Sequence, residues 1–318
     1  MAPITSPFLG KLDVDLTNFA IEHRNRGYVS DLIAPIVSVA KQSDKYVIFG
    51  SEGLKDPGDI VRGPGAAAKE LVQSLSRDSY ACEDHAASRI VALEEVSNLA
   101  GVRDPFEWAT RMLLDRVIFL KRELELIAKV TDAAQYNASN KLTLAGITQW
   151  TDGPNSDPIG DVLAMAKAVA LGSGVDLGSM QMVIGWESLE ALKVHPKIEG
   201  RLVHTRGGAV TLRDISDIFE MPVNLSSARK DVAGVFQFLW PDTVWIGFVT
   251  ATPNREDVSF AKTFLFSGAP DTVGGVGVER SPVFPASRKA ESVDVHYWHS
   301  DAKITTKDAG AIIIDTNA

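Results

Sequence analysis

Residues 104–136, DPFEWATRMLLDRVIFLKRELELIAKVTDAAQY, carry the most regular pattern in the chain. Asp104 is a favourable helix N-cap, and Pro105 suits the first helical position, where its missing N–H costs nothing. Side chains that can form one buried face recur at spacings of three and four: Phe106, Ala109, Leu113, Val117, Leu120, Leu124, Ile127 and Thr131. Charged residues fill most positions between them, so the stretch predicts an amphipathic helix. If this helix reaches Tyr136, it is about 48 Å long at roughly 1.5 Å per residue.

This helix is expected to pack across a sheet. A coiled coil is the alternative, but the pattern lasts only about three to four heptads and has no matching second helix nearby. Glu123 and Glu125 fall among the charged positions and are assigned to a solvated face.

Two segments before the helix predict strands. Residues 45–49 are rich in β-formers, and residues 70–92 alternate in part between apolar and polar side chains. A charged excursion rich in glycine and proline separates them, at residues 50–58 and 62–65. Together they predict a long two-stranded ribbon with a mobile tip. Because an isolated hairpin is marginally stable in water, we expect this ribbon to lean on another chain.

Residues 1–44 show little internal periodicity. Residues 13–20 mix polar and apolar side chains without a long period, and a helical turn or two is predicted over residues 28–33, before Pro35. Such a segment is either a frayed terminus or an arm that lies on a neighbouring subunit.

Short helices and strands alternate after the turn-rich stretch at residues 152–158. Helices are predicted over residues 159–170, with Leu163, Ala166 and Val169 on one face, over 186–193, and from the cap Thr211 to Phe219. Strands are predicted over 180–184, 223–225 and 243–250, and then, after the α/β unit, over 260–266, 276–280, 292–299 and 309–315.

The composition limits the possible functions. The 318 residues are 45% hydrophobic and 23% charged, which is typical of a soluble globular protein. The formal net charge of −9 argues against a protein that wraps nucleic acid, but not against one that encloses it. The single cysteine, Cys82, excludes an internal disulfide framework and fits a reducing cytoplasm. Neither a signal peptide nor a membrane-spanning stretch is visible.

The sequence shows no motif for nucleotide binding, metal binding or nucleophilic catalysis. The glycine-rich residues 274–277 continue into a predicted strand, without the helix that a dinucleotide site needs. His296 and His299 are three apart on a predicted strand, so they point to opposite faces and cannot chelate together. The cluster from Cys82 to His85 lacks a second ligand pair for zinc, and residues 185–189 lack the second glycine of a nucleophile elbow. The sequence therefore predicts no catalytic residue, cofactor site or metal site, and no enzyme.

The order of these segments resembles that of the major capsid proteins of tailed bacteriophages with the HK97-type fold. Short stretches carry the rest of the resemblance: DLTN (15–18), YVSD (28–31) with Pro35, KQSDKY (41–46), DSYACE (78–83), PNSDP (154–158) and LKVHPK (192–197).

The resemblance implies an α+β fold with named parts. These are an N-terminal arm (1–44), an extended β-ribbon loop (45–92), a spine-helix peripheral domain (93–155 and 253–318) and an inserted α/β axial domain (156–252). It implies a virion capsid protein that self-assembles, in the host cytoplasm, into pentamers and hexamers of an icosahedral head around genomic DNA. DNA would be enclosed without sequence-specific binding, and no membrane is involved.

The resemblance also implies partners and contacts. The family-like sequence begins almost at Met1, which predicts a separate scaffolding protein, with a portal and a decoration protein as further partners. Some family members crosslink a loop lysine to an asparagine of a neighbour. Lys55 and Lys69 lie in the matching region, although no motif selects either, and with Arg62 they are the candidate assembly contacts. The alternatives are an encapsulin-like shell around cargo and a hydrolase with the α/β insert as its substrate domain.

Overall fold

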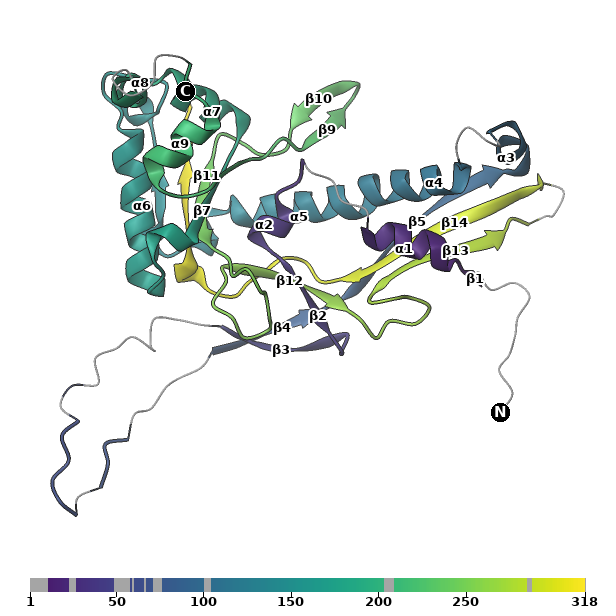
Figure 1. The fold of residues 1–318 in the computed structure, drawn as a ribbon, viewed down its shortest axis with the longest axis horizontal. Coiled ribbons are helices and arrows are strands. Elements are labelled where there is room, and N and C mark those ends of the chain that lie inside the picture. Colours follow the sequence, from purple (N-terminus) through teal and green to yellow (C-terminus); the bar gives the residue numbers. More distant parts are fainter. Residues whose placement is uncertain are drawn as a thin grey trace.

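The computed structural model describes residues 11–22, 27–48, 58, 60–65, 67–70, 76–99, 104–202, 209–284 and 288–317. Figure 1 shows two sheets at opposite ends of an elongated body, with a long helical element running between them. A ribbon and a hairpin project from this body, the first formed by β3 and β4 and the second by β9 and β10.

The long helical element, called the spine below, consists of α4 (Pro105–Leu113), a π-helical segment (Leu114–Phe119) and α5 (Leu120–Val130). Asp104 caps it as predicted, because its Oδ1 accepts a hydrogen bond from the backbone N–H of Phe106 at 2.8 Å. The spine ends at Val130 rather than at residue 136. There, Asp132 starts a separate 3-10 turn (Ala133–Gln135), accepting from the N–H of Ala134 at 2.9 Å.

The π-helical segment changes which side of the spine is buried. Each π turn holds an extra residue, so the side chains beyond it are rotated relative to a continuous α-helix. Leu114, Ile118 and Leu126 are buried, whereas Leu124, which was predicted on the buried face, is exposed. The same rotation buries Glu123, which was predicted to be solvated, while Glu125 stays partly exposed.

The larger sheet has seven strands in the order β1-β13-β14-β12-β15, with β2 joined to β12 and β5 to β14. Their bounds are β1 Lys11–Leu12, β2 Ile36–Val39, β5 Glu83–Ala92, β12 Ala261–Phe266, β13 Val276–Pro282, β14 Ala290–His299 and β15 Lys303–Ile304. The helices α1 (Val14–Glu22) and α4 pack against it, and α3 (Leu93–Leu99) follows β5. Their shared core includes Leu16, Phe106, Val278 and Val293, which confirms a helix packed across a sheet.

The smaller sheet has five strands in the order β6-β16-β11-β7-β8. Their bounds are β6 Lys141–Thr143, β7 Met180–Ile184, β8 Val223–Leu225, β11 Val244–Phe248 and β16 Gly310–Ile314. Four helices accompany them: α6 Pro158–Ser173, α7 Trp186–Val194, α8 Pro196–Leu202 and α9 Leu212–Phe219. Further 3-10 turns lie at Ala138–Asn140, Gly146–Thr148, Leu177–Ser179 and Lys307–Ala309.

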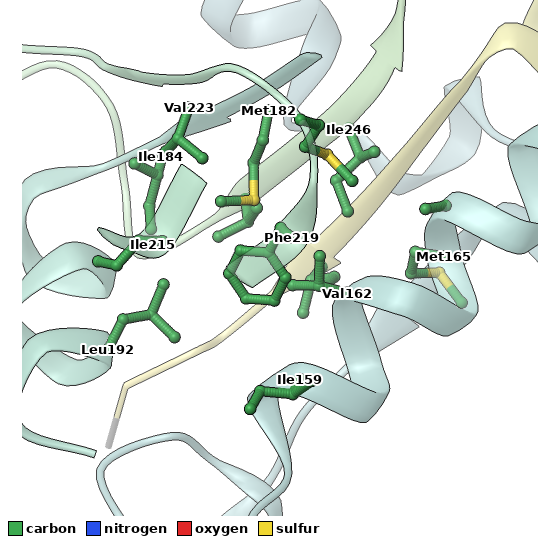
Figure 2. Packing of buried hydrophobic residues seen from close by; sticks show 14 of the residues in the cluster. Ile159, Val162, Met165, Met182, Ile184, Leu192, Ile215, Phe219, Val223 and Ile246 are labelled. Atoms are coloured by element: carbon green, nitrogen blue, oxygen red, sulfur yellow. The ribbon is translucent and has the colours of Figure 1, made fainter. Parts of the chain in front are cut away.

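Figure 2 shows the core of this unit, where Phe219 lies among aliphatic and methionine side chains of the helices and sheet. The capping box predicted at Thr211 is present, since Thr211 and Asp214 bond each other's backbone N–H groups. Leu163 was predicted to be buried but is 40% exposed. The buried side of α6 instead carries Ile159 and Val162, because Leu163 lies one position further round the helix.

The sheet of this unit is not formed by residues 156–252 alone. Strands β6 and β16 come from outside that range, and β16 lies between β6 and β11. The predicted domain boundaries therefore stay predictions, but the unit depends on residues that follow it in the chain.

The ribbon consists of β3 (Ser43–Ile48) and β4 (Ser76–Ala81), paired antiparallel from Ser43 opposite Ala81 to Ile48 opposite Ser76. The prediction of one strand-like stretch over residues 70–92 is wrong, because the strand is interrupted at Cys82. Beyond it, β5 leaves the ribbon and pairs with β14. Cys82 is buried, because the chain enters the body of the protein at this residue.

The N-terminal segment folds back on its own chain over residues 11–22 and 27–39. A nine-residue helix, α1, was not predicted, because it is too short to show a clear period. The predicted turn is α2 (Ser30–Ile33), and β2 pairs in parallel with β12. Leu16 and Ile33 are buried, so an arm lying on a neighbour is a wrong description of these residues. Residues 1–10 lie outside the described ranges.

Candidate assembly surfaces

The base of the ribbon is held by an aromatic cluster. Tyr46 on β3, Tyr80 on β4 and Cys82 are all buried against Phe264 of β12. The ring of Tyr80 stacks on that of Phe264 with 4.3 Å between centroids, and the Tyr46 ring lies 5.5 Å from it. The Tyr46 hydroxyl donates to Asp78 at 3.2 Å. These contacts fix one end of the ribbon to the larger sheet.

The outer part of the ribbon carries two of the three candidate assembly residues. Arg62 and Lys69 are exposed, as is every described residue from 58 to 70, whereas Lys55 lies outside the described residues. The structure does not bring Arg62 and Lys69 to a common site on the body. Val61, beside Arg62, is 89% exposed, which is unusual for a β-branched apolar side chain. The role of these residues stays a prediction.

A second projection, the hairpin of β9 (Arg229–Val232) and β10 (Val235–Phe238), was not predicted from the sequence. Its two-residue turn has positive φ angles at Ala233 (55°) and Gly234 (87°), as a type I′ turn requires. The Asp231 carboxylate accepts from the Gly234 N–H at 2.7 Å. The sequence signal was weak, because alanine rarely occupies the first of these positions.

The four apolar side chains on the strands of this hairpin are exposed. Phe236 is 74% and Val235 is 62% exposed, and Val232 and Phe238 are exposed as well. Phe238 stacks on Trp186 of α7, with 5.5 Å between ring centroids and an interplanar angle of 6°. Figure 1 shows the hairpin extending away from both sheets. A group of exposed apolar side chains of this kind is typical of an interaction surface.

The spine also carries two buried charges. The Glu123 carboxylate accepts from the backbone N–H groups of Val29 at 3.1 Å and Ser30 at 2.9 Å, which caps α2. Burial raises the pKa of Glu123. Arg122 donates to Asp31 at 2.8 Å. These contacts attach the N-terminal segment to the spine, and the sequence did not reveal them because their partners lie about ninety residues away.

Two histidines meet on the face of the larger sheet that α5 approaches. His299 of β14 is buried, and its ring centroid is 4.0 Å from that of His85 on β5. Glu125 of α5 lies 4.0 Å from His85 Nε2 and 3.9 Å from His299 Nε2. Burial, followed by the effects of His85 and Arg122, lowers the pKa of His299 to about 3. His299 is therefore a neutral imidazole near pH 7.

His296 behaves as its strand position predicts. It lies on the opposite face from His299 and pairs with Asp84 at 2.8 Å. The prediction that these two histidines do not face each other is confirmed. Sequence spacing could not show that His85, from another strand, would stand beside His299.

The cysteine lies in packed surroundings. Burial raises the pKa of the Cys82 thiol to about 11, so the thiol is protonated at neutral pH and inert as a nucleophile. Among the described residues, none of the helices combines the length and the apolar character needed to cross a membrane.

Comparisons with known proteins identify relatives. No protein-family profile matches the chain. The major capsid protein of Pseudomonas phage JBD67 is 28% identical over 226 residues, which are 70% of each chain. The major capsid protein of Burkholderia phage BcepMu is 25% identical over 211 residues, or 66% of each chain.

Solved structures share the fold. A phage-related protein from Bordetella bronchiseptica matches with a TM-score of 0.78 and 24% identity, over 97% of this chain and 98% of that one. An encapsulin from Synechococcus elongatus matches with a TM-score of 0.54 and 11% identity, over 97% of both chains. These neighbours have the HK97-type fold, and so does this chain. The two curated relatives are major capsid proteins of phages, and they support the predicted role of a capsid shell protein.

Proposed function

We propose that copies of this chain join into pentamers and hexamers, which close into an icosahedral phage head around genomic DNA. The observation that carries this proposal is the exposed apolar hairpin β9–β10, which the described residues of the chain leave largely uncovered. A neighbouring copy that covers Phe236 and Val235 would remove this apolar surface from water. Because many such contacts act together in a closed shell, each can be weak.

The ribbon supplies a second contact in this proposal. Its base is fixed to the body of the subunit by Tyr46 and Tyr80. That outer part exposes Arg62 and Lys69, whereas the whole chain carries a net charge of −9. These exposed basic side chains can pair with acidic groups of the next subunit, which favours overlap of the ribbon with it.

The role proposed for the chain is structural, without catalysis, cofactor or metal chemistry in the assembly itself. The net charge of −9 fits enclosure of DNA without sequence-specific binding, because a protein that binds DNA tightly neutralises phosphates with clustered lysine and arginine. A scaffolding protein, a portal and a decoration protein stay predicted partners, and assembly in the host cytoplasm stays a predicted location.

The test is a deletion of residues 53–65. We expect a folded subunit, with the circular dichroism spectrum and cooperative melting of the parent chain, that forms no stable shells in negative-stain electron microscopy. A matched control replaces the same residues with glycine and serine at equal length. It distinguishes the effect of a shorter ribbon from the effect of losing these side chains. Normal shells from the deletion variant would overturn the proposal for the ribbon.

An encapsulin-like shell would share this fold. The two functions can be distinguished by what the particles contain. Particles purified after expression with a phage genome should hold nuclease-protected DNA, whereas a cargo compartment would hold a protein. Particles that exclude DNA and retain one host enzyme would favour the alternative.

A further inference from the structure

Three potential metal ligands converge on one face of the larger sheet, from elements far apart in the sequence. In the β5–β14 ladder, His85 lies directly opposite Tyr297, so His299, two residues along, is its diagonal neighbour on the same face. Glu125 reaches this face from α5. The ligand atoms of the three side chains all lie within 4.8 Å of one another.

The orientation of the histidines favours a ligand between them. Nδ1 of His85 is 3.2 Å from the carbonyl oxygen of Glu83, and Nδ1 of His299 is 3.4 Å from that of Tyr297. Each ring can therefore donate its Nδ1–H to the backbone and keep the Nε2 lone pair for the site, the arrangement usual for metal-bound histidine.

The buried nitrogen lacks a hydrogen bond. Nε2 of His299 is buried, has no hydrogen-bond partner in the described structure, and faces the Glu125 carboxylate at 3.9 Å. A buried polar atom without a partner costs free energy, and a bound cation would satisfy it. The His299 side chain is 1% exposed, while His85 and Glu125 are 18% and 23% exposed, which leaves a path from solvent.

We propose that His85, Glu125 and His299 form a binding site for a divalent transition-metal cation of the Zn²⁺ class. Two imidazoles and one carboxylate are a ligand set that zinc uses, with the fourth position left to water. Around a tetrahedral zinc ion, ligand atoms are about 3.4 Å apart. The three ligand atoms lie within 4.8 Å of one another, so binding draws them together by at most about 1.4 Å, which side-chain rotation can supply.

Two neighbouring cations oppose binding and set its strength. Lys121 pairs with Glu125 at 3.2 Å but is 53% exposed, so it can turn into solvent when a metal arrives. Arg122 is buried nearby and pairs with Asp31 at 2.8 Å. We therefore expect weaker binding than in a closed four-ligand structural site. A bound ion would join α5 to β5 and β14, and so hold the spine to the strand that follows the ribbon in the chain.

The experiment uses the full chain, purified with a chelator and then freed of it, and titrated with ZnCl₂ by calorimetry at pH 7.5. We expect one saturable Zn²⁺ per chain. His85→Ala and Glu125→Gln should each weaken the Kd at least tenfold, and His296→Ala is the matched control that should leave it unchanged. Cobalt(II) in place of zinc should give a visible absorption band that His85→Ala abolishes.

Melting of each metal-free variant confirms that it is folded, which matters most for residues that pack against the sheet. The proposal is overturned if the parent chain binds no zinc at millimolar concentration, if binding survives both ligand substitutions in folded protein, or if His296→Ala removes it. None of these outcomes depends on whether shells form, so the site and the proposed assembly are tested separately.

Discussion

The ribbon β3–β4 and the hairpin β9–β10 are both two-stranded antiparallel sheets outside the two larger sheets, but their apolar side chains have opposite surroundings. In the ribbon, Tyr46 and Tyr80 are buried on Phe264 of the same chain. In the hairpin, Phe236 and Val235 are exposed to solvent. Two strands alone are marginally stable, so the contacts of the ribbon with its own subunit stabilise it. The hairpin contacts its own subunit through the stack of Phe238 on Trp186, and it leaves Phe236 and Val235 available to a neighbouring copy.

This difference separates folding from assembly. Substitutions at the ribbon base should lower the free energy of unfolding of the single chain. Substitutions on the exposed side of the hairpin should leave that free energy unchanged and affect the association of copies.

The largest expected effect is loss of shells from Phe236→Ser. The substitution removes an exposed aromatic ring, so the free energy of unfolding should change by less than about 0.5 kcal/mol. The same loss repeated at every contact should abolish particles in electron microscopy. Leu171→Ser on α6 is the matched control, since Leu171 is also 74% exposed, and it should still form shells. Particles of normal yield from Phe236→Ser would remove the hairpin from the assembly surface.

Tyr80→Ala should be the most destabilising change to the single chain. It leaves a cavity beside Phe264, and truncation of a buried aromatic side chain costs about 3–5 kcal/mol. Urea unfolding followed by fluorescence measures the loss. Tyr80→Phe is the control: it removes only the 3.3 Å hydrogen bond to the Lys41 carbonyl and should cost about 1 kcal/mol. Equal effects of the two variants would contradict the proposed packing.

The stability contributed by the ribbon base should depend on pH in the alkaline range. The folded pKa of Cys82 is raised to about 11 from an ordinary value of 9.0, so between these values the unfolded thiol loses its proton and the folded thiol keeps it. Stability is therefore fully present below pH 9 and falls as the pH rises toward 11. In Cys82→Ala, the urea midpoint should no longer show the part of this pH dependence that is due to the thiol. Any pH dependence due to other groups should remain. Identical pH profiles for the two chains would contradict a buried thiol.

The smallest expected effect is at the hairpin turn. Ala233 has a φ of 55°, where an alanine side chain is strained by about 1 kcal/mol and glycine is not. Ala233→Gly should slow amide exchange at Val232 and Val235, with little change in global unfolding because the hairpin is attached at one end only. Gly234→Ala provides the opposite test, since a side chain at φ 87° should speed that exchange.

The sequence predicted the elements whose signals are local. The Asp104 cap, the Thr211 capping box and the strand at Met180–Ile184 follow from short-range patterns. The π-helical segment was not predictable in this way, because it shifts the register of the spine without changing its composition, and this misplaced Leu124 and Glu123.

The missed parts of the site depend on distant partners. His85 and His299 meet only because β5 pairs with β14 in one register, and Cys82 interrupts a strand because the chain there enters the core. The hairpin was not predicted for a local reason: Ala233 occupies a turn position where glycine or asparagine is usually found.

The position of β16 in the smaller sheet has a consequence for biosynthesis. Every other strand of that sheet precedes it in the chain, yet β16 lies between β6 and β11. At roughly 5–20 residues per second, a ribosome needs several seconds after β11 to deliver it. Until then the hydrogen-bonding edge of β11 has no partner from β16, and the unit lacks part of its core. A nascent chain would therefore reach its assembly-competent form only after β16 has been made, which delays contacts between copies still held on one messenger RNA.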